Sequence, residues 1–256
     1  MTANRHEAIG IKQSIRLEWM QKATNLLLVG LDSKAIRQEL HEFLAERKGN
    51  GSEGERGATS RSQVVNMLMK IWVSPDSELV SFRDVSLAFL REHPSMGLAV
   101  HWGMISAVYP FWFNVARQTG RLLTLQDQVT QTQIINRLKE QYGDRQTVSR
   151  YGRFVIRSFV AWGALKDSET KGCYEKSAPT SVADQNLAVL MFEAALYATP
   201  EGKGTLGLLL NNPALFPFQI PVMTGDFVSQ RSDRIDVVRY GLDDELLKLA
   251  STSNSR

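Results

Sequence analysis

The strongest constraint in this sequence of 256 residues is a helical pattern near its middle. At about 100° per residue, one side of a helix over residues 144–162 collects the apolar side chains Val148, Tyr151, Val155, Ile156, Phe159 and Trp162. Gln146, Arg150, Arg153 and Arg157 fall on the opposite side. A helix with this pattern buries one side and exposes the other, basic side.

The segments on either side of this helix extend the pattern. Apolar spacing predicts a preceding helix that ends at Tyr142-Gly143, and Asp144 is a natural N-cap for the basic helix. The connection between the two helices is therefore short. After Gly163, residues 165–177 are suited to a two-stranded antiparallel wing. Helix, short turn, basic helix and basic hairpin is the order of a winged helix-turn-helix.

The rest of the chain is also mainly helical by its apolar spacing. Helices are expected at residues 11–29, 32–47, 59–72, 76–91, 94–108 and 111–122, from Ser181 or Asp184 through Tyr197, and at 205–210. Residues 48–58, rich in Gly, Ser and Glu, predict a flexible loop. Near the C-terminus we expect a β-hairpin that pairs Phe227–Ser229 with Ile235–Tyr240, and then a short helix over Asp243–Leu249.

These elements predict a mainly α fold, a helical bundle with helix-turn-helix or winged-helix-like parts and a small C-terminal β-hairpin. Residues 1–120 form an N-terminal, helix-turn-helix-like part. Residues 121–256 form a winged-helix-like part with C-terminal helices and the hairpin. Five aromatic residues between 102 and 113 could stack nucleic-acid bases, but they fall in the least charged part of the chain, so we interpret them as core.

The charge distribution indicates an anionic partner. The chain has a net charge of +3, whereas residues 117–176 alone contain 11 Lys/Arg and 6 Asp/Glu, a local excess of +5. No acid lies between Asp144 and Asp167, and guanidinium groups bind phosphate bidentately. We therefore predict binding to double-stranded DNA through Arg145, Gln146, Ser149, Arg150, Arg153, Arg157, Lys166 and Lys171. The alternative is a protein–protein adaptor in which the aromatic block docks a larger partner and the arginines meet acidic side chains.

The sequence offers little for catalysis. Its single cysteine, Cys173, excludes an internal disulfide, and its four histidines lack metal-ligand spacing. Residues 201–205 lack the glycine and lysine spacing of a phosphate-binding loop. We therefore predict a protein that is not an enzyme, with no catalytic, cofactor-binding or metal-binding residue. Residues 1–16 lack the apolar core of a signal peptide, and residues 104–116 are too few to span a membrane, so a cytoplasmic location is expected.

Three stretches of the chain together resemble a known family. They are Leu28–Asp32, Thr147–Leu165 and Val237–Asp243. In their order and content they resemble the BrxA proteins of bacteriophage-exclusion (BREX) defence systems. The resemblance implies a helical core with winged elements, DNA binding, and association with other proteins of a phage-defence system. The Gly/Glu-rich loop at residues 48–58 and a greater length distinguish this chain from the family.

Overall fold

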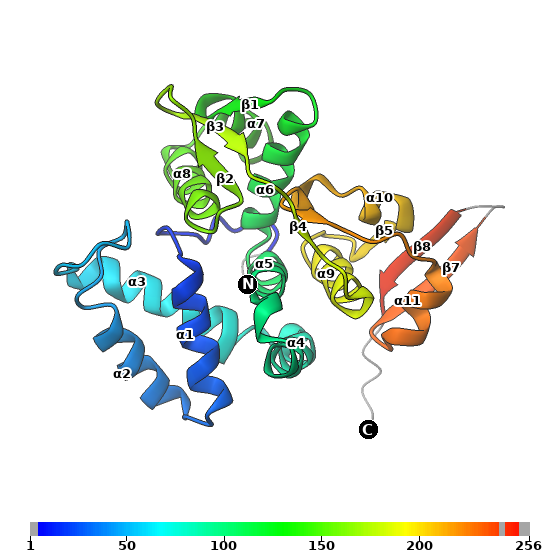
Figure 1. Ribbon diagram of the computed structural model, residues 1–256, viewed down its shortest axis with the longest axis horizontal. Helices are drawn as coiled ribbons and strands as arrows, with labels where there is room; N and C mark the ends of the chain where they lie inside the picture. The colour runs from blue at the N-terminus through cyan, green and yellow to red at the C-terminus, as the bar shows by residue number, and fades with distance from the viewer. Residues whose placement is uncertain (1–4, 241–243, 251–256) are drawn as a thin grey trace.

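The computed structural model describes residues 5–240 and 244–250 and shows a mainly helical chain. Three lobes surround helix α5 (Gly97–Val108), which lies at the centre of the molecule (Figure 1). All residues of α5 except Leu98 are buried, as expected for a helix that is apolar on every side. None of the helices in the described part of the chain combines the length and apolar composition that a membrane span requires.

The first lobe is a bundle of N-terminal helices. It contains α1 (Leu17–Leu28), α2 (Ser33–Phe43), α3 (Ala58–Leu68) with its π-helical continuation Met69–Val73, and α4 (Val80–Glu92). Asp32 caps α2 by accepting a hydrogen bond of 2.8 Å from the Ala35 amide. The helix predicted to start at Ile11 is wrong in its first turns, because it begins at Leu17 and the residues before it are not helical.

The loop between α2 and α3 has its own hydrogen bonds and one buried arginine. Its backbone closes on itself, with the Lys48 amide donating to the Ser52 carbonyl at 2.9 Å and the Gly54 amide to the Glu46 carbonyl at 2.9 Å. The Arg56 side chain is buried, and its guanidinium lies 4.7 Å from the centre of the Trp19 ring. The burial of Arg56 was not predicted, because an arginine between glycines is not part of an apolar pattern. That the loop is flexible stays a prediction.

The second lobe contains the basic helix. Its elements are α6 (Pro110–Leu123), β1 (Gln128–Thr130), α7 (Gln131–Tyr142), α8 (Gln146–Ala161), β2 (Leu165–Asp167) and β3 (Cys173–Lys176). The strands form an antiparallel sheet in the order β1-β3-β2, so the predicted pair of strands after α8 is present and gains a third member. Strand β1 was not predicted because three residues are too few to show an alternating pattern.

The third lobe mixes helices with short strands. It contains β4 (Thr180–Ser181), α9 (Gln185–Tyr197), β5 (Lys203–Thr205), α10 (Leu206–Leu210), β6 (Phe218–Gln219), α11 (Gly225–Arg231), β7 (Ile235–Tyr240) and β8 (Asp244–Leu249). Strands β5, β8 and β7 form an antiparallel sheet with β8 in the middle, and β4 pairs in parallel with β6. Asp184, rather than Ser181, caps α9.

The C-terminal prediction is wrong in two ways. The segment Phe227–Ser229 is helical, within α11, where the Thr224 side chain accepts from the Phe227 amide at 3.3 Å. The segment expected as a helix over Asp243–Leu249 is instead β8, with Asp243 itself outside the described residues. As the middle strand, β8 pairs on both edges and buries Leu247 completely. This tertiary pairing outweighs the weak local helix signal.

The aromatic cluster is core, as predicted. Trp102 and Trp112 are fully buried, and their rings lie 5.0 Å and 4.9 Å from that of Phe159. Buried apolar residues of all three lobes belong to one continuous hydrophobic cluster. The expected boundary at residue 120 lies within α6, where the Gly120 Cα approaches the Pro213 carbonyl so closely that a Cβ would lie 1.9 Å from its oxygen. A division into two parts at this point stays a prediction.

The N-terminal residues 5–16, called the strap from here on, run over all three lobes without forming a helix or strand (Figure 1). Arg5 donates to the Ala107 carbonyl of α5 and forms an ion pair with Glu78 at 2.7 Å. The His6 ring lies 3.1 Å from the carbonyl oxygen of Tyr197, at the end of α9. Further along, the strap reaches α3 and α8. The strap therefore binds elements that lie far along the chain, with up to 191 residues between a strap residue and its partner.

The buried histidine of α5 predicts how stability depends on pH. His101 is fully buried against the edge of Trp72, and burial lowers its pKa from 6.5 to about 3. Below pH 6.5 the unfolded chain binds a proton at this site that the folded chain does not, so stability falls as the pH falls from 6.5 towards 3. We expect His101→Phe to reduce this loss by about 1 kcal/mol per pH unit in urea unfolding. Trp72→Phe, which leaves the histidine in place, should retain the wild-type dependence; an unchanged dependence in His101→Phe would contradict the assignment.

Candidate nucleic-acid interface

Helices α7 and α8 are joined by residues 143–145 and pack closely. Gly143 has a φ of +82°, in the left-handed region that glycine adopts readily, and it ends α7. On α8, Gly152 faces α7, where an added Cβ would lie 2.6 Å from the Ile135 Cδ1 atom. The hydroxyl of Tyr142 accepts a hydrogen bond of 2.5 Å from Asn114 of α6. The turn and both helices are thus fixed to the core of the lobe.

The two sides of α8 are those that the spacing predicts. Val148, Val155, Ile156 and Phe159 are fully buried. The outward face, defined as Gln146, Arg150, Arg153 and Arg157, is exposed along its length. Ser149 lies half-buried at the side of this face. Tyr151 was expected in the core, but it is also half-buried and stacks on Phe154, with 6.2 Å between the ring centres.

The N-terminus of α8 differs from the prediction in its cap. Asp144 does not cap the helix; its carboxylate lies 2.8 Å from the Lys139 Nζ atom of α7. The N-cap position belongs to Arg145, which makes no side-chain capping bond and donates to the Tyr142 carbonyl at 2.8 Å. The first amides of α8 are therefore without a side-chain cap, and Arg145 lies over the turn rather than on the outward face.

Arg157 was predicted to have no acidic neighbour, but it has one in the structure. Strand β2 begins only four residues after α8 ends, and Asp167 on β2 forms an ion pair with Arg157. Arg157 donates a hydrogen bond to Asp167, and this bond is the main cause that raises the pKa of Arg157. Sequence spacing missed this pair because the two residues meet only after the chain reverses. Arg150 and Arg153 make no ion pair within the described part of the chain.

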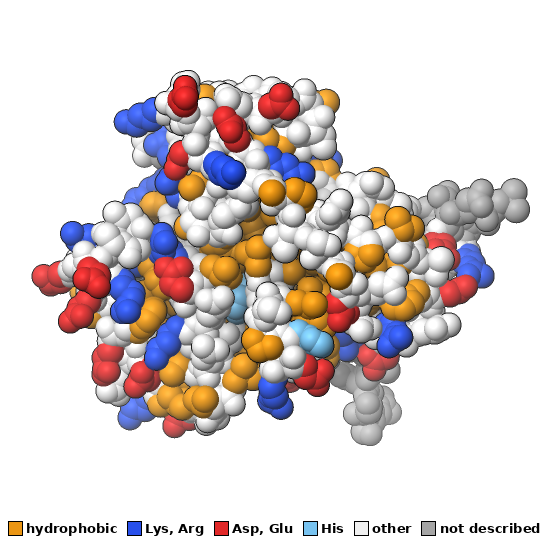
Figure 2. Space-filling model, in the orientation of Figure 1, with side chains coloured by type: hydrophobic (Ala, Val, Ile, Leu, Met, Phe, Trp, Pro, Cys, Tyr) orange, Lys and Arg blue, Asp and Glu red, His pale blue; other side chains and the backbone are white. Residues whose placement is uncertain are grey.

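The predicted wing lysines are exposed but have acidic neighbours. Lys166 on β2 lies directly opposite Glu175 of β3, and Lys171 is in the β2–β3 turn together with Glu169. Below this turn is a depression of about 880 Å³, lined among others by Thr130, Arg157, Asp167, Lys171 and Tyr174. Basic and acidic side chains intermingle over the second lobe on the face that Figure 2 shows. The basic surface is therefore concentrated on α8 rather than on the sheet.

The strap covers the C-terminal half of α8, which the sequence did not indicate. The Ile15 amide donates to the Ser158 hydroxyl at 2.9 Å, and the Trp162 indole donates to the Ile15 carbonyl at 2.9 Å. Ile15, Ser158 and Trp162 are all buried. The exposed arginines thus lie on the part of the helix that precedes this clamp. The isoleucines at positions 9, 11 and 15 could have indicated that this segment packs against the core. Their spacing, however, also fits the start of a helix.

Within residues 5–240 and 244–250, no three His, Cys, Asp or Glu side chains are grouped as metal ligands. Cys173 is a free, half-buried thiol on β3.

Comparisons of the chain with models of protein families, with curated proteins and with solved structures found no match.

The clamp between strap and helix gives a stability prediction. Ser158→Ala leaves the buried Ile15 amide without an acceptor and should cost about 1–3 kcal/mol in the free energy of unfolding. The matched control is Ser149→Ala on the same helix, where the side chain makes no hydrogen bond of this kind and the change should stay within about 0.5 kcal/mol. Urea unfolding of both variants measures the difference. Equal losses in the two would show that this hydrogen bond does not hold the strap.

Proposed function

We propose that this protein binds double-stranded DNA through the outward face of α8, as a non-catalytic component of a phage-defence or regulatory assembly. The observation that carries the proposal is the exposed face of Gln146, Arg150 and Arg153 on a helix whose other side is fixed in the core. Duplex DNA attracts such a face because each arginine that binds a phosphate releases condensed counterions. An α-helix fits the major groove.

The arrangement of the second lobe supports this proposal. The order α6, β1, α7, turn, α8, β2, β3 is compatible with a winged helix, in which the second helix of the helix-turn-helix reads the major groove. The N-terminal residues of such a helix come closest to base edges, so Gln146 is the first candidate for a base contact, and Arg145 would have to leave the Tyr142 carbonyl to make one. Arg150 and Arg153 would bind phosphates. Lys166 and Lys171, on the wing, would contact the flanking backbone.

In this proposal Arg157 binds a phosphate only when the phosphate displaces Asp167. Its guanidinium is bound to Asp167, which competes with any phosphate for the same donors. Both side chains are about half exposed, so the pair contributes little to stability, about 0–1 kcal/mol. A phosphate could replace the carboxylate at small cost. We therefore propose Arg150 and Arg153 as the main phosphate ligands and Arg157 as a ligand in competition with Asp167.

The rival proposal is a protein–protein adaptor without DNA binding. The intermingled charges of the second lobe and the Arg157–Asp167 pair favour it, because they show carboxylates already bound to this surface (Figure 2). Membership of a defence assembly rests only on the resemblance to the BrxA family. The two proposals differ in how binding to isolated duplex DNA responds to salt.

The salt dependence of duplex binding tests the proposal. In fluorescence anisotropy titrations at several salt concentrations, Arg150→Ala with Arg153→Ala should reduce the magnitude of the negative slope of log affinity against log salt by about 0.9 for each arginine. Asp167→Asn should strengthen binding and increase the magnitude of this slope by up to about 0.9, because it frees Arg157. Circular dichroism confirms that each variant is folded.

The matched control removes two exposed arginines elsewhere, with Arg91→Ala on α4 and Arg231→Ala on α11. It lowers the net charge equally and should leave the slope within about 0.3 of the wild type, since only charges at the interface release counterions. No duplex binding by the wild type at low salt, or equal slopes for both double variants, would reject DNA binding by α8 and favour the adaptor.

A further inference from the structure

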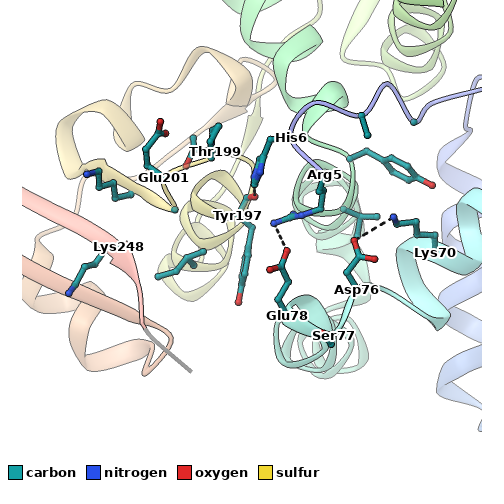
Figure 3. A pocket seen from close by; sticks show the side chains of 18 residues that line it. Arg5, His6, Lys70, Asp76, Ser77, Glu78, Tyr197, Thr199, Glu201 and Lys248 are labelled. Carbon is teal, nitrogen blue, oxygen red and sulfur yellow. Dashed lines mark hydrogen bonds and ion pairs between the residues drawn. The ribbon is translucent and has the colours of Figure 1, made fainter. Parts of the chain in front are cut away.

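A second feature, away from α8, is a groove of about 1010 Å³ between the strap and the third lobe. Its walls are the strap, the end of α9 with the turn that follows it, and strands β5 and β8, while Asp76 and Glu78 of the first lobe close its far side (Figure 3). This volume is at the upper end of the range of small-molecule sites, about 300–1,000 Å³. Tyr109 and Tyr197 give the groove aromatic surface.

The first-lobe acids of the groove are already paired. Glu78 binds Arg5 at 2.7 Å, and Asp76 lies 3.4 Å from the Lys70 Nζ atom. These pairs are drawn as dashed lines in Figure 3. Glu201, on the turn before β5, is exposed and has no ion pair within the described residues. A ligand in the groove therefore meets one unpaired carboxylate, at the solvent edge.

At the end of the groove formed by β5 and β8, two lysines with like charges lie opposite each other. Lys203 of β5 and Lys248 of β8 both line the groove and lie directly opposite each other in the antiparallel pair. Like charges in this register destabilise a sheet. Lys248 has a partner in Asp236 at 3.5 Å, whereas Lys203 makes no ion pair among residues 5–240 and 244–250. An anion between the two ammonium groups would relieve this repulsion.

Two further groups of the groove wall suit the rest of such a ligand. The Nε atom of Arg5 is buried and has no hydrogen-bond partner in the described structure, so the strap has an unused donor. Tyr197 presents a half-buried ring, and its phenol is a neutral donor at physiological pH, with a pKa that burial raises from 10 to about 12. An apolar or aromatic body could pack on this ring.

We propose that the groove is a binding site for a small molecule with a phosphate or carboxylate group, held between Lys203 and Lys248, whose body lies against Tyr197. The site is separate from the outward face of α8, and the proposal does not depend on DNA binding. Because the strap forms one wall, an occupied groove holds residues 5–10 more firmly against the third lobe.

Isothermal titration calorimetry with phenyl phosphate and with benzoate, at constant ionic strength, tests this site. The two probes share an aromatic body and differ in the head group, and benzyl alcohol is the uncharged control. We expect saturable, one-to-one binding of at least one anionic probe and none of benzyl alcohol. Lys203→Gln with Lys248→Gln should weaken that binding at least tenfold, whereas Lys34→Gln, on α2, should leave it unchanged.

The double lysine variant should remain folded, so that a loss of binding can be assigned to the groove. Lys203 and Lys248 are exposed, and replacing both removes a pair of opposed like charges together with one half-exposed ion pair to Asp236, which should not unfold the sheet, as thermal melting by circular dichroism checks. The tighter-binding probe identifies phosphate or carboxylate as the preferred group. Absence of saturable binding by both anions, equal binding of benzyl alcohol, or undiminished binding by the double lysine variant would each overturn the proposal.

Discussion

The structure depends most on the two hydrogen bonds that fix the strap to α8. The amide and the carbonyl of Ile15 are both buried, and each takes a partner from α8, Ser158 and Trp162 respectively. A buried backbone group without a partner is costly, so these two side chains determine the path of the strap. Arg5 and His6 fix its other end to α5 and α9. One extended segment thereby links the lobe that carries the basic helix to the rest of the protein and forms a wall of the groove.

The clamp also decides which part of α8 is available. The strap and the aromatic core around Phe159 cover the inner side of its C-terminal half, whereas Gln146, Arg150 and Arg153 on its outer side face solvent. A recognition helix needs this combination, because side chains that contact DNA must be exposed while the helix that carries them must not move. The Arg157–Asp167 pair lies at the transition between the two halves, which limits the freely available basic surface to Arg150 and Arg153.

The predictable features were those set by local periodicity. The buried and exposed sides of α8, the Asp32 cap and the helix at residues 185–197 all follow from side chains within a few turns of one another. The misses came from contacts between distant residues. The strap follows α8 because of partners 143 and 147 residues away, and β8 is a strand because β5 and β7 flank it. Asp167 reaches Arg157 only through the reversal after α8. In the strap and in β8 tertiary partners overrode the local helix signal, and at Arg157 they added an acid that local spacing did not show.

Site-directed cross-linking tests the central claim, that duplex DNA lies against the N-terminal half of α8. The native thiol is removed with Cys173→Ser, and a single new cysteine, labelled with a benzophenone, is introduced by Gln146→Cys or, as a control on α2, by Lys34→Cys. With equal amounts of duplex at low salt, we expect a protein–DNA cross-link from position 146 at a yield well above that from position 34. Equal yields from the two positions, or none from position 146 while the duplex remains bound, would contradict the account.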